Sequence, residues 1–214
     1  MMGSGKSTVG SLLAEKLGYM AFDTDSVIEQ ATGSSVVSIF ESEGEEAFRD
    51  METDVLKQLS PLTRTVICTG GGAVLRSVNW GCMTHGISVW LDVPVATLAR
   101  RVDAQGADSR PLAAGGDEEG DRSGEGVEAI EKRLEALREE RKKSYGQADI
   151  HLEVPGAAEP ERVCELVLDE MEVRVREVLT KRNMAEIQHD SGGFGIGNIN
   201  TVQDDSGNGS QPLL

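Results

Sequence analysis

The sequence predicts an α/β protein with a mainly parallel sheet, and two observations support this fold class. Short apolar runs alternate along the chain with stretches in which apolar residues recur at helical spacing. A glycine-rich loop, "MMGSGKST", leads directly into one of these helical stretches. With 214 residues and a hydrophobic content of 38%, the chain can bury one core. We therefore expect a single α/β domain.

The first element is this loop together with the helix that follows it. Gly5, Lys6 and Ser7 match the end of the phosphate-binding pattern G-x-x-x-x-G-K-[ST], whose first glycine would fall one position before Met1. Such a loop holds phosphates on backbone N–H groups, bridges them with its lysine and coordinates Mg²⁺ through its hydroxyl. A glycine-rich segment without a ligand is the alternative. The candidate nucleotide-binding residues are Gly3, Ser4, Gly5, Lys6, Ser7 and Thr8.

The remainder of the domain alternates strands with helices. Apolar runs predict strands at 20–22, 65–69, 87–93 and 149–154. Apolar residues at helical spacing predict helices from Ser7 to Leu17 and over 44–59, 94–102 and 127–145.

Two segments differ in composition from the rest of the domain. Residues 113–126 are acidic and rich in glycine, so we expect a mobile flap within a lid at about 106–126. Residues 183–214 contain too few apolar side chains to offset the entropy of ordering them. We therefore expect a domain at 1–182 and a disordered tail after it.

Two carboxylates follow the first predicted strand in the segment "FDTD", Asp23 and Asp25. The carboxyl ends of parallel strands are where such sheets contact ligands. One carboxylate could lie near a metal ion and the other near a substrate hydroxyl. The alternative is that the segment only caps the helix after it.

The segment "TGGGAV" ends the next strand with Gly70, Gly71 and Gly72. Three glycines in a row are costly unless the backbone turns sharply or approaches a ligand closely, and both interpretations remain open. Candidate anion ligands on three other elements are Arg49, Arg110 and Arg141, although arginines on so acidic a chain are commonly solvated surface.

The charge and the cysteines exclude several classes of function. A net charge of −16 argues against nonspecific binding to nucleic acid or to anionic membranes. Cys68, Cys82 and Cys164 have no spacing typical of disulfides or zinc sites, which favours a reducing compartment. No apolar run reaches the roughly 18 residues of a membrane span. The histidines His85, His151 and His189 show no pattern of a site, so we expect surface or packing roles.

Together the motifs resemble those of the shikimate kinases, of the plant plastid type, over roughly residues 1–182. The similar segments are "MGSGKSTVG", "FDTD", "EGEEAFRDMETDVL", "TGGGAV" and "SRPL", in the order of that family and at similar spacing. The resemblance implies a three-layer αβα P-loop kinase fold with a central parallel sheet of five strands and a lid. The first of those strands is absent here, so we expect the chain as given to fold poorly, because burying such a strand contributes about 10 kcal/mol.

The resemblance also implies the activity, which is ATP-dependent phosphorylation of the 3-hydroxyl of shikimate in the pathway to aromatic amino acids. On the nucleotide side it assigns Lys6 and Ser7 to the ATP phosphates and Mg²⁺, and Asp23 to the metal through water. It assigns Arg101 to stacking on adenine and Arg110 to the transferring phosphate.

On the acceptor side, the resemblance makes Asp25 the base at the reacting hydroxyl. Arg49 and Arg141 would hold the shikimate carboxylate, and Gly70, Gly71 and Gly72 would contact the ring. The implied catalytic set is Asp25, Lys6 and Arg110.

Two alternatives remain open at this stage. One is a kinase-like protein that binds shikimate without turnover, suggested by the incomplete loop. The other is a kinase for another small hydroxy acid such as gluconate. Location in the plastid stroma follows from the resemblance alone.

Overall fold

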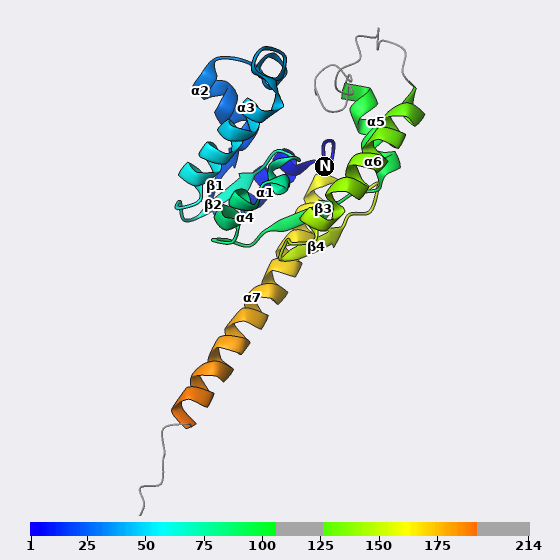
Figure 1. The fold of residues 1–214 in the computed structure, drawn as a ribbon. Helices are drawn as coiled ribbons and strands as arrows, with labels where there is room; N and C mark the ends of the chain where they lie inside the picture. The colour runs from blue at the N-terminus through cyan, green and yellow to red at the C-terminus, as the bar shows by residue number, and fades with distance from the viewer. Residues whose placement is uncertain (106–125, 192–214) are drawn as a thin grey trace, which may run out of the picture. The chain divides into compact units, whose positions relative to one another are not determined.

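The computed structural model describes residues 1–105 and 126–191, with side chains at 1–104 and 126–181 (Figure 1). The predicted lid, including Arg110, lies outside the described residues apart from Gly126. The chain divides into two compact units, residues 1–175 and 176–214. All of the described strands belong to the first unit. The elements are α1 (Lys6–Leu17), β1 (Met20–Asp23), α2 (Thr24–Thr32), α3 (Val36–Leu59), β2 (Thr65–Cys68), η1 (Ala73–Leu75), α4 (Ser77–Met83), β3 (Val89–Asp92), α5 (Val95–Gln105), α6 (Val127–Tyr145), β4 (Ile150–Glu153) and α7 (Pro160–Ser191).

The predicted fold class is confirmed, since helices alternate with parallel strands at all four predicted strand positions. β1 pairs with β2, so that Asp23 lies opposite Cys68 at the carboxyl ends of both strands. β3 pairs with β4, so that Asp92 lies opposite Glu153. Among the described residues the strands therefore form two parallel sheets of two strands each. Of the candidate site residues, Asp23, Asp25 and the three glycines 70–72 lie at or just after the carboxyl ends of β1 and β2.

The helix boundaries follow local capping rules. α1 begins at Gly5, whose φ of 83° is left-handed, and ends at Gly18, whose N–H bonds to the carbonyls of Ala14 and Glu15. The Asp23 side chain caps α2 by accepting from the N–H groups of Asp25 and Ser26. α3 includes the predicted helix 44–59 but starts earlier, because Ser35 caps a first segment that bends at Gly44.

α7 continues to Ser191, so that residues 183–191, the start of the predicted tail, are helical. The sequence there, "NMAEIQHDS", has few apolar residues, which is why its composition predicts disorder. It contains strong helix formers such as methionine, alanine and glutamate, whose intrinsic propensity favours a helix. None of the described helices combines the length and the apolar composition that a bilayer-spanning segment needs.

Two clusters of buried apolar residues support this arrangement. The larger one joins α1, β3, β4, α5, α6 and the start of α7, with Leu98, Leu134 and Cys164 at its centre. The smaller one joins α2 and α3 through Ile28, Ile39, Phe48, Val55 and Leu59. α6 is thus fixed to the large cluster, and α3 to the small one.

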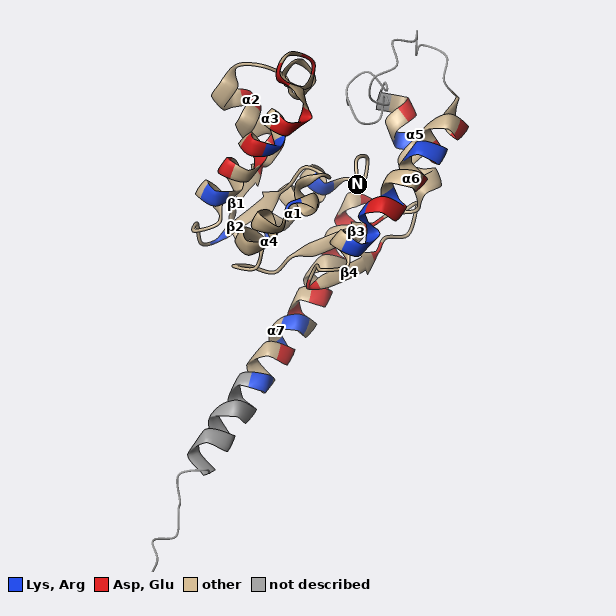
Figure 2. Ribbon diagram, in the orientation of Figure 1, with Lys and Arg blue, Asp and Glu red and all other residues tan. Residues whose placement is uncertain are grey.

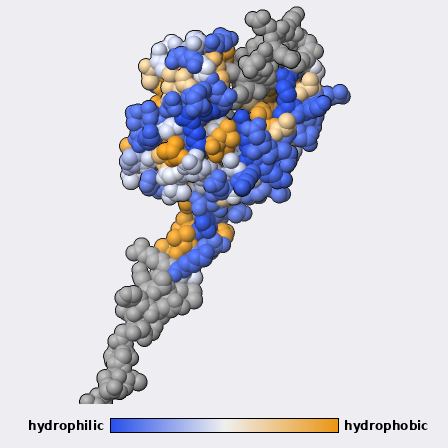
Figure 3. All heavy atoms as spheres, viewed as in Figure 1, coloured by the Kyte–Doolittle hydropathy of each residue, from blue (hydrophilic) through white to orange (hydrophobic). Residues whose placement is uncertain are grey.

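The outer surface is mostly polar. Acidic residues lie along α3, and both signs of charge lie along α6 and α7 (Figure 2). Hydrophobic residues form separate areas on the visible face, and the exposed ones on α7 are Val173, Val175, Val178 and Leu179 (Figure 3).

We predict that Leu134→Ala lowers the free energy of unfolding by about 2–5 kcal/mol, because it removes a side chain only 1% exposed at the centre of the large cluster. Urea unfolding followed by circular dichroism would measure the change. The matched control is Leu62→Ala, whose side chain is 43% exposed, and which should change stability by less than about 0.5 kcal/mol. Equal effects of the two substitutions would contradict the packing of α6.

Candidate functional site

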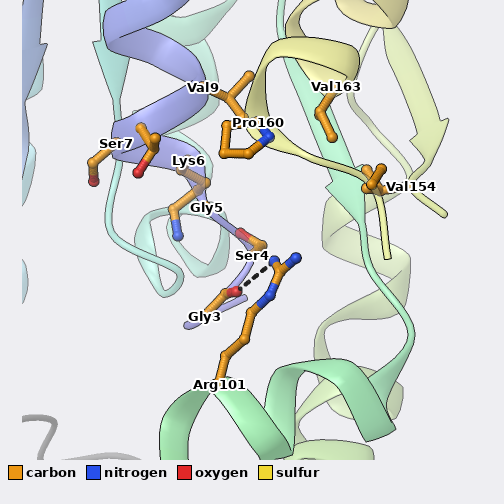
Figure 4. A pocket seen from close by; sticks show the side chains of 12 residues that line it. Gly3, Ser4, Gly5, Lys6, Ser7, Val9, Arg101, Val154, Pro160 and Val163 are labelled. Carbon is orange, nitrogen blue, oxygen red and sulfur yellow. Dashed lines mark hydrogen bonds between the residues drawn. The ribbon is translucent and has the colours of Figure 1, made fainter. Parts of the chain in front are cut away.

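The N-terminal loop forms one wall of a cavity of about 360 Å³ (Figure 4). Residues 3–9 line one side, and Val154, Ala158, Pro160 and Val163 line the other. Arg101 reaches in from α5, and its Nη1 donates to the carbonyl of Gly3 at 3.2 Å. The N-terminus of α1, a lysine, an arginine and an apolar wall therefore meet in one space. This combination suits a ligand with phosphates at one end and a flat apolar group at the other.

The lysine and serine of the loop have defined partners. Lys6 Nζ donates to the carbonyl of Met1 at 2.9 Å, and the Ser4 hydroxyl donates to the same oxygen at 2.9 Å. The Ser7 hydroxyl donates to Asp23 Oδ2 at 2.5 Å, which joins the start of α1 to the end of β1. A hydroxyl and a carboxylate at this distance are hard oxygen ligands of the kind Mg²⁺ prefers alongside phosphate and water. The residues present fit that ion.

The structure confirms the helix cap of the "FDTD" segment, while the metal and substrate roles of its carboxylates stay predictions. Asp23 Oδ1 caps α2 by accepting from the N–H groups of Asp25 at 3.1 Å and Ser26 at 3.3 Å. The second oxygen of the same carboxylate is the one that meets Ser7. The cap therefore fixes the carboxylate that faces the loop.

The three glycines after β2 are surrounded by side chains from three helices. A Cβ atom on Gly70 would lie 2.4 Å from Glu52 Oε1 and 3.0 Å from Asp25 Oδ1. A Cβ atom on Gly72 would lie 2.2 Å from Arg49 Nη2. The distances to Glu52 and Arg49 are far inside van der Waals contact, so a Cβ atom at Gly70 or Gly72 would force these side chains to move. The structure thus brings Asp25, Arg49 and the glycine segment together.

Arg49 lies buried between acidic and aromatic groups of α3. Its guanidinium pairs with Glu45 at 2.9 Å and with Glu52 at 2.9 Å. It also lies 5.4 Å from the centre of the Phe48 ring, a cation–π contact. Burial raises the pKa of the Glu52 carboxyl above its usual range, and the attraction of Arg49 opposes this without cancelling it. The pair therefore holds the arginine in place against the glycines.

Arg141 is equally buried but differently paired. Only 5% of the residue is exposed, and its Nη1 lies 3.4 Å from the carbonyl of Gly71. Its Nε is buried without a hydrogen-bond partner in the described part of the chain. A buried guanidinium with an unused donor is costly unless an anion completes it. The second predicted arginine therefore offers a donor to a ligand beside the glycine segment.

Sequence reasoning missed two residues of this cluster, Glu52 and Tyr145. Glu52 is fully buried beside Arg49, and the Tyr145 hydroxyl donates to the carbonyl of Gly71 at 2.6 Å. Each lies three or four positions after a predicted arginine on the same helix, Arg49 and Arg141. Residues at that spacing share a helix face. This signal could have identified both.

The histidines with described side chains have the roles expected of them. His85 is exposed on the surface. His151 stacks on Trp90 at 4.0 Å, and its Nε2 lies 3.0 Å from Asp92 Oδ2. Within the described residues there is also no cluster of three or more His, Cys, Asp or Glu side chains that could hold a metal ion on its own.

Comparison with known proteins identifies the relatives of this chain. The family model described as shikimate kinase matches residues 2–172. Shikimate kinase 1, chloroplastic, of Arabidopsis thaliana is 48% identical over 159 residues, which cover 74% of this chain and 50% of that protein. The shikimate kinase of Gloeobacter violaceus is 47% identical over 177 residues, which cover 83% of this chain and 92% of that protein. The chain thus spans about half the length of the plant relative and most of the cyanobacterial one.

A solved structure gives the same result at the level of the fold. The structure of shikimate kinase from Acinetobacter baumannii in complex with shikimate matches with a TM-score of 0.70 and 33% identity. The match covers 80% of this chain and 89% of that one.

We predict that Gly72→Ala lowers the free energy of unfolding by about 1–3 kcal/mol, because the new methyl group overlaps the Arg49 guanidinium. Gly72 has a φ of −97°, which any residue adopts, so the substitution tests space alone. Gly81→Ala is the matched control, because nothing lies within 4 Å of its Cβ position on α4. Thermal unfolding of both variants would measure the difference. A Gly72→Ala variant as stable as the control would contradict the contact.

Proposed function

The chain belongs to the shikimate kinase family, and from this we propose that it transfers the γ-phosphoryl group of ATP to the 3-hydroxyl of shikimate. The observation that carries the proposal is the buried, incompletely bonded Arg141 beside Arg49 and the glycine segment. Shikimate is a carboxylate with ring hydroxyls. A guanidinium pair supplies the charge-assisted hydrogen bonds that an anion needs in so acidic a protein.

The acceptor hydroxyl would be handled by Asp25. Its Oδ1 lies against Gly70, on the same segment that contacts both arginines. A carboxylate positioned at the attacking oxygen can accept its proton as the new bond to phosphorus forms. Arg49 and Arg141 would hold the carboxylate of shikimate, and Gly70, Gly71 and Gly72 would contact its ring.

The donor side would be the cavity at the loop. Gly3, Ser4, Gly5 and Thr8 would hold the ATP phosphates through backbone N–H groups, Lys6 would bridge the outer two, and Arg101 would cover the adenine. Ser7 would coordinate Mg²⁺, with Asp23 behind it through water, and the bound ion would neutralise charge on the phosphates. Arg110, which lies outside the described residues, would act on the transferring phosphate. This positioning supports transfer to the sugar-like acid rather than to water.

Location in the plastid is part of the same proposal. It is supported by the names of two plant relatives, from Arabidopsis thaliana and Solanum lycopersicum, both described as chloroplastic. Detection of the protein in purified plastids of its source would test it.

The decisive experiment is ADP release with Mg·ATP and shikimate, with the product identified by mass spectrometry. We expect turnover on the order of 1–100 s⁻¹, the range of many kinases. Gluconate as acceptor is the control and should give no product. Shikimate binding without ADP release would favour a non-catalytic relative, and phosphorylation of gluconate alone would reassign the acceptor.

We predict that Asp25→Asn lowers kcat by about 10²–10⁴-fold, because it removes the proton acceptor while keeping the size of the side chain. The dissociation constant of shikimate, measured by calorimetry, should change much less. Asp54→Asn is the matched control on α3, since this carboxylate is 68% exposed and pairs only at the surface with Lys57. An unchanged kcat in the Asp25 variant would remove that residue from the mechanism.

A further inference from the structure

We infer that Tyr145 is a positioning residue of the acceptor site, whose hydroxyl fixes the peptide between Gly71 and Gly72 in the orientation that substrate binding needs. The inference rests on the proposed function, because it concerns the same shikimate site. Tyr145 would not touch the reacting atoms. It would act through the glycine backbone and beside Arg141.

The hydrogen bond itself is short and buried. Tyr145 Oη donates to the carbonyl of Gly71 at 2.6 Å, and the residue is 6% exposed. Within the described residues, a second donor at that oxygen is Arg141 Nη1, at 3.4 Å. The tyrosine therefore makes the stronger of the two contacts.

The consequence follows from peptide geometry. A trans peptide is planar, and its C=O and N–H point in opposite directions. Fixing the carbonyl of Gly71 therefore also fixes the N–H of Gly72, which points the opposite way within the same plane. Gly72 is the residue packed against the Arg49 guanidinium. The Tyr145 hydroxyl thus orients two backbone groups of the glycine segment. One is the N–H of Gly72, beside Arg49, and the other is the carbonyl of Gly71, beside Arg141.

The ring of Tyr145 is rigid enough for this task. It stacks on Trp90 of β3, with ring centres 5.4 Å apart and planes 17° apart. Trp90 in turn stacks on His151 of β4. The same face of α6 is fixed about two turns earlier by Arg138, whose Nη2 donates to Asp92 Oδ2 at 2.7 Å. The hydroxyl is therefore held from both the helix and the sheet.

The hydroxyl also stays in its donating form. Burial raises the pKa of Tyr145 above its usual value, and the nearby Arg141 only partly opposes this. The group is therefore protonated at neutral and mildly alkaline pH.

The glycine segment needs such support more than other turns do. Three successive glycines lose more backbone entropy on ordering than any other residues would. Beyond them, Asn79 donates to the carbonyl of Ala73 at 2.9 Å, and Trp80 Nε1 donates to that of Val74 at 3.0 Å. Side-chain donors thus secure the carbonyls of residues 71, 73 and 74. Within the glycines themselves, Tyr145 makes the shorter of the two side-chain hydrogen bonds, and Arg141 makes the longer one.

The test compares Tyr145→Phe with Trp80→Phe, because each variant loses one hydrogen bond from an aromatic side chain to a carbonyl of the same segment. Tyr145→Phe keeps the ring that stacks on Trp90. We expect it to raise KM and the calorimetric dissociation constant for shikimate by about threefold to tenfold, the effect of one neutral hydrogen bond. KM for ATP and kcat should change less than about twofold by the same reasoning. Trp80→Phe should lower the melting temperature without changing either shikimate constant.

Each outcome decides the question. Unchanged shikimate constants in Tyr145→Phe, with an active wild-type protein, would overturn the inference and leave the proposed function intact. The inference would also fail if KM rose equally for both substrates, or if Trp80→Phe matched the Tyr145 variant, because the effect would then be structural. A wild-type protein that neither binds nor phosphorylates shikimate would overturn the proposed function and the inference together.

Discussion

The acceptor side of the site depends on one constraint, which is the close approach of helix side chains to the backbone of residues 70–72. α2 contributes Asp25, α3 contributes Arg49 and Glu52, and α6 contributes Arg141 and Tyr145. As they stand, the side chains of Glu52 and Arg49 leave no room for a Cβ atom at Gly70 or Gly72. The two glycines therefore allow α3 to pack this closely against the end of the β1–β2 sheet. The small size of Gly70 and Gly72 therefore serves the packing of the fold, apart from any role in catalysis.

Burying two arginines in so acidic a chain has an energetic consequence. The cost of burying Arg49 is offset within α3 by Glu52, which lies one turn away, and by the partly exposed Glu45. The cost of burying Arg141 is offset in part by the carbonyl of Gly71, which accepts from Nη1. Its Nε has no hydrogen-bond partner among the described residues. The free protein therefore keeps a buried cationic donor, Arg141 Nε, that an anion could satisfy. Binding and stability are linked at this point, since a ligand that pairs with Arg141 favours the folded state.

The sequence predicted most of this arrangement, and its failures have physical reasons. The loop from Gly3, the strands and the helix 127–145 are local patterns, and all were predicted correctly. Glu52 was missed because a carboxylate on an apolar helix face looks like an exposed residue until its partner is known. The helix at 183–191 was not predicted because the argument from apolar content took no account of the helix propensity of this segment. Contacts between elements, such as Tyr145 with Gly71, depend on tertiary packing that no local pattern encodes.

Residues 23–25 contact both parts of the candidate site, the N-terminal loop and the glycine segment 70–72. Asp23 accepts from Ser7 on the phosphate-loop side, and the buried Thr24 hydroxyl accepts from the N–H of Gly70 on the other side. Asp25 then lies against Gly70 itself. Three successive residues, held by the end of β1 and the cap of α2, thus contact both halves. Because the three residues are consecutive, the backbone between the end of β1 and the first turn of α2 sets the distance between the N-terminal loop and the glycine segment. In the proposed reaction, Asp23 could therefore serve the phosphoryl donor and Asp25 the phosphoryl acceptor, with no flexible segment between the two carboxylates.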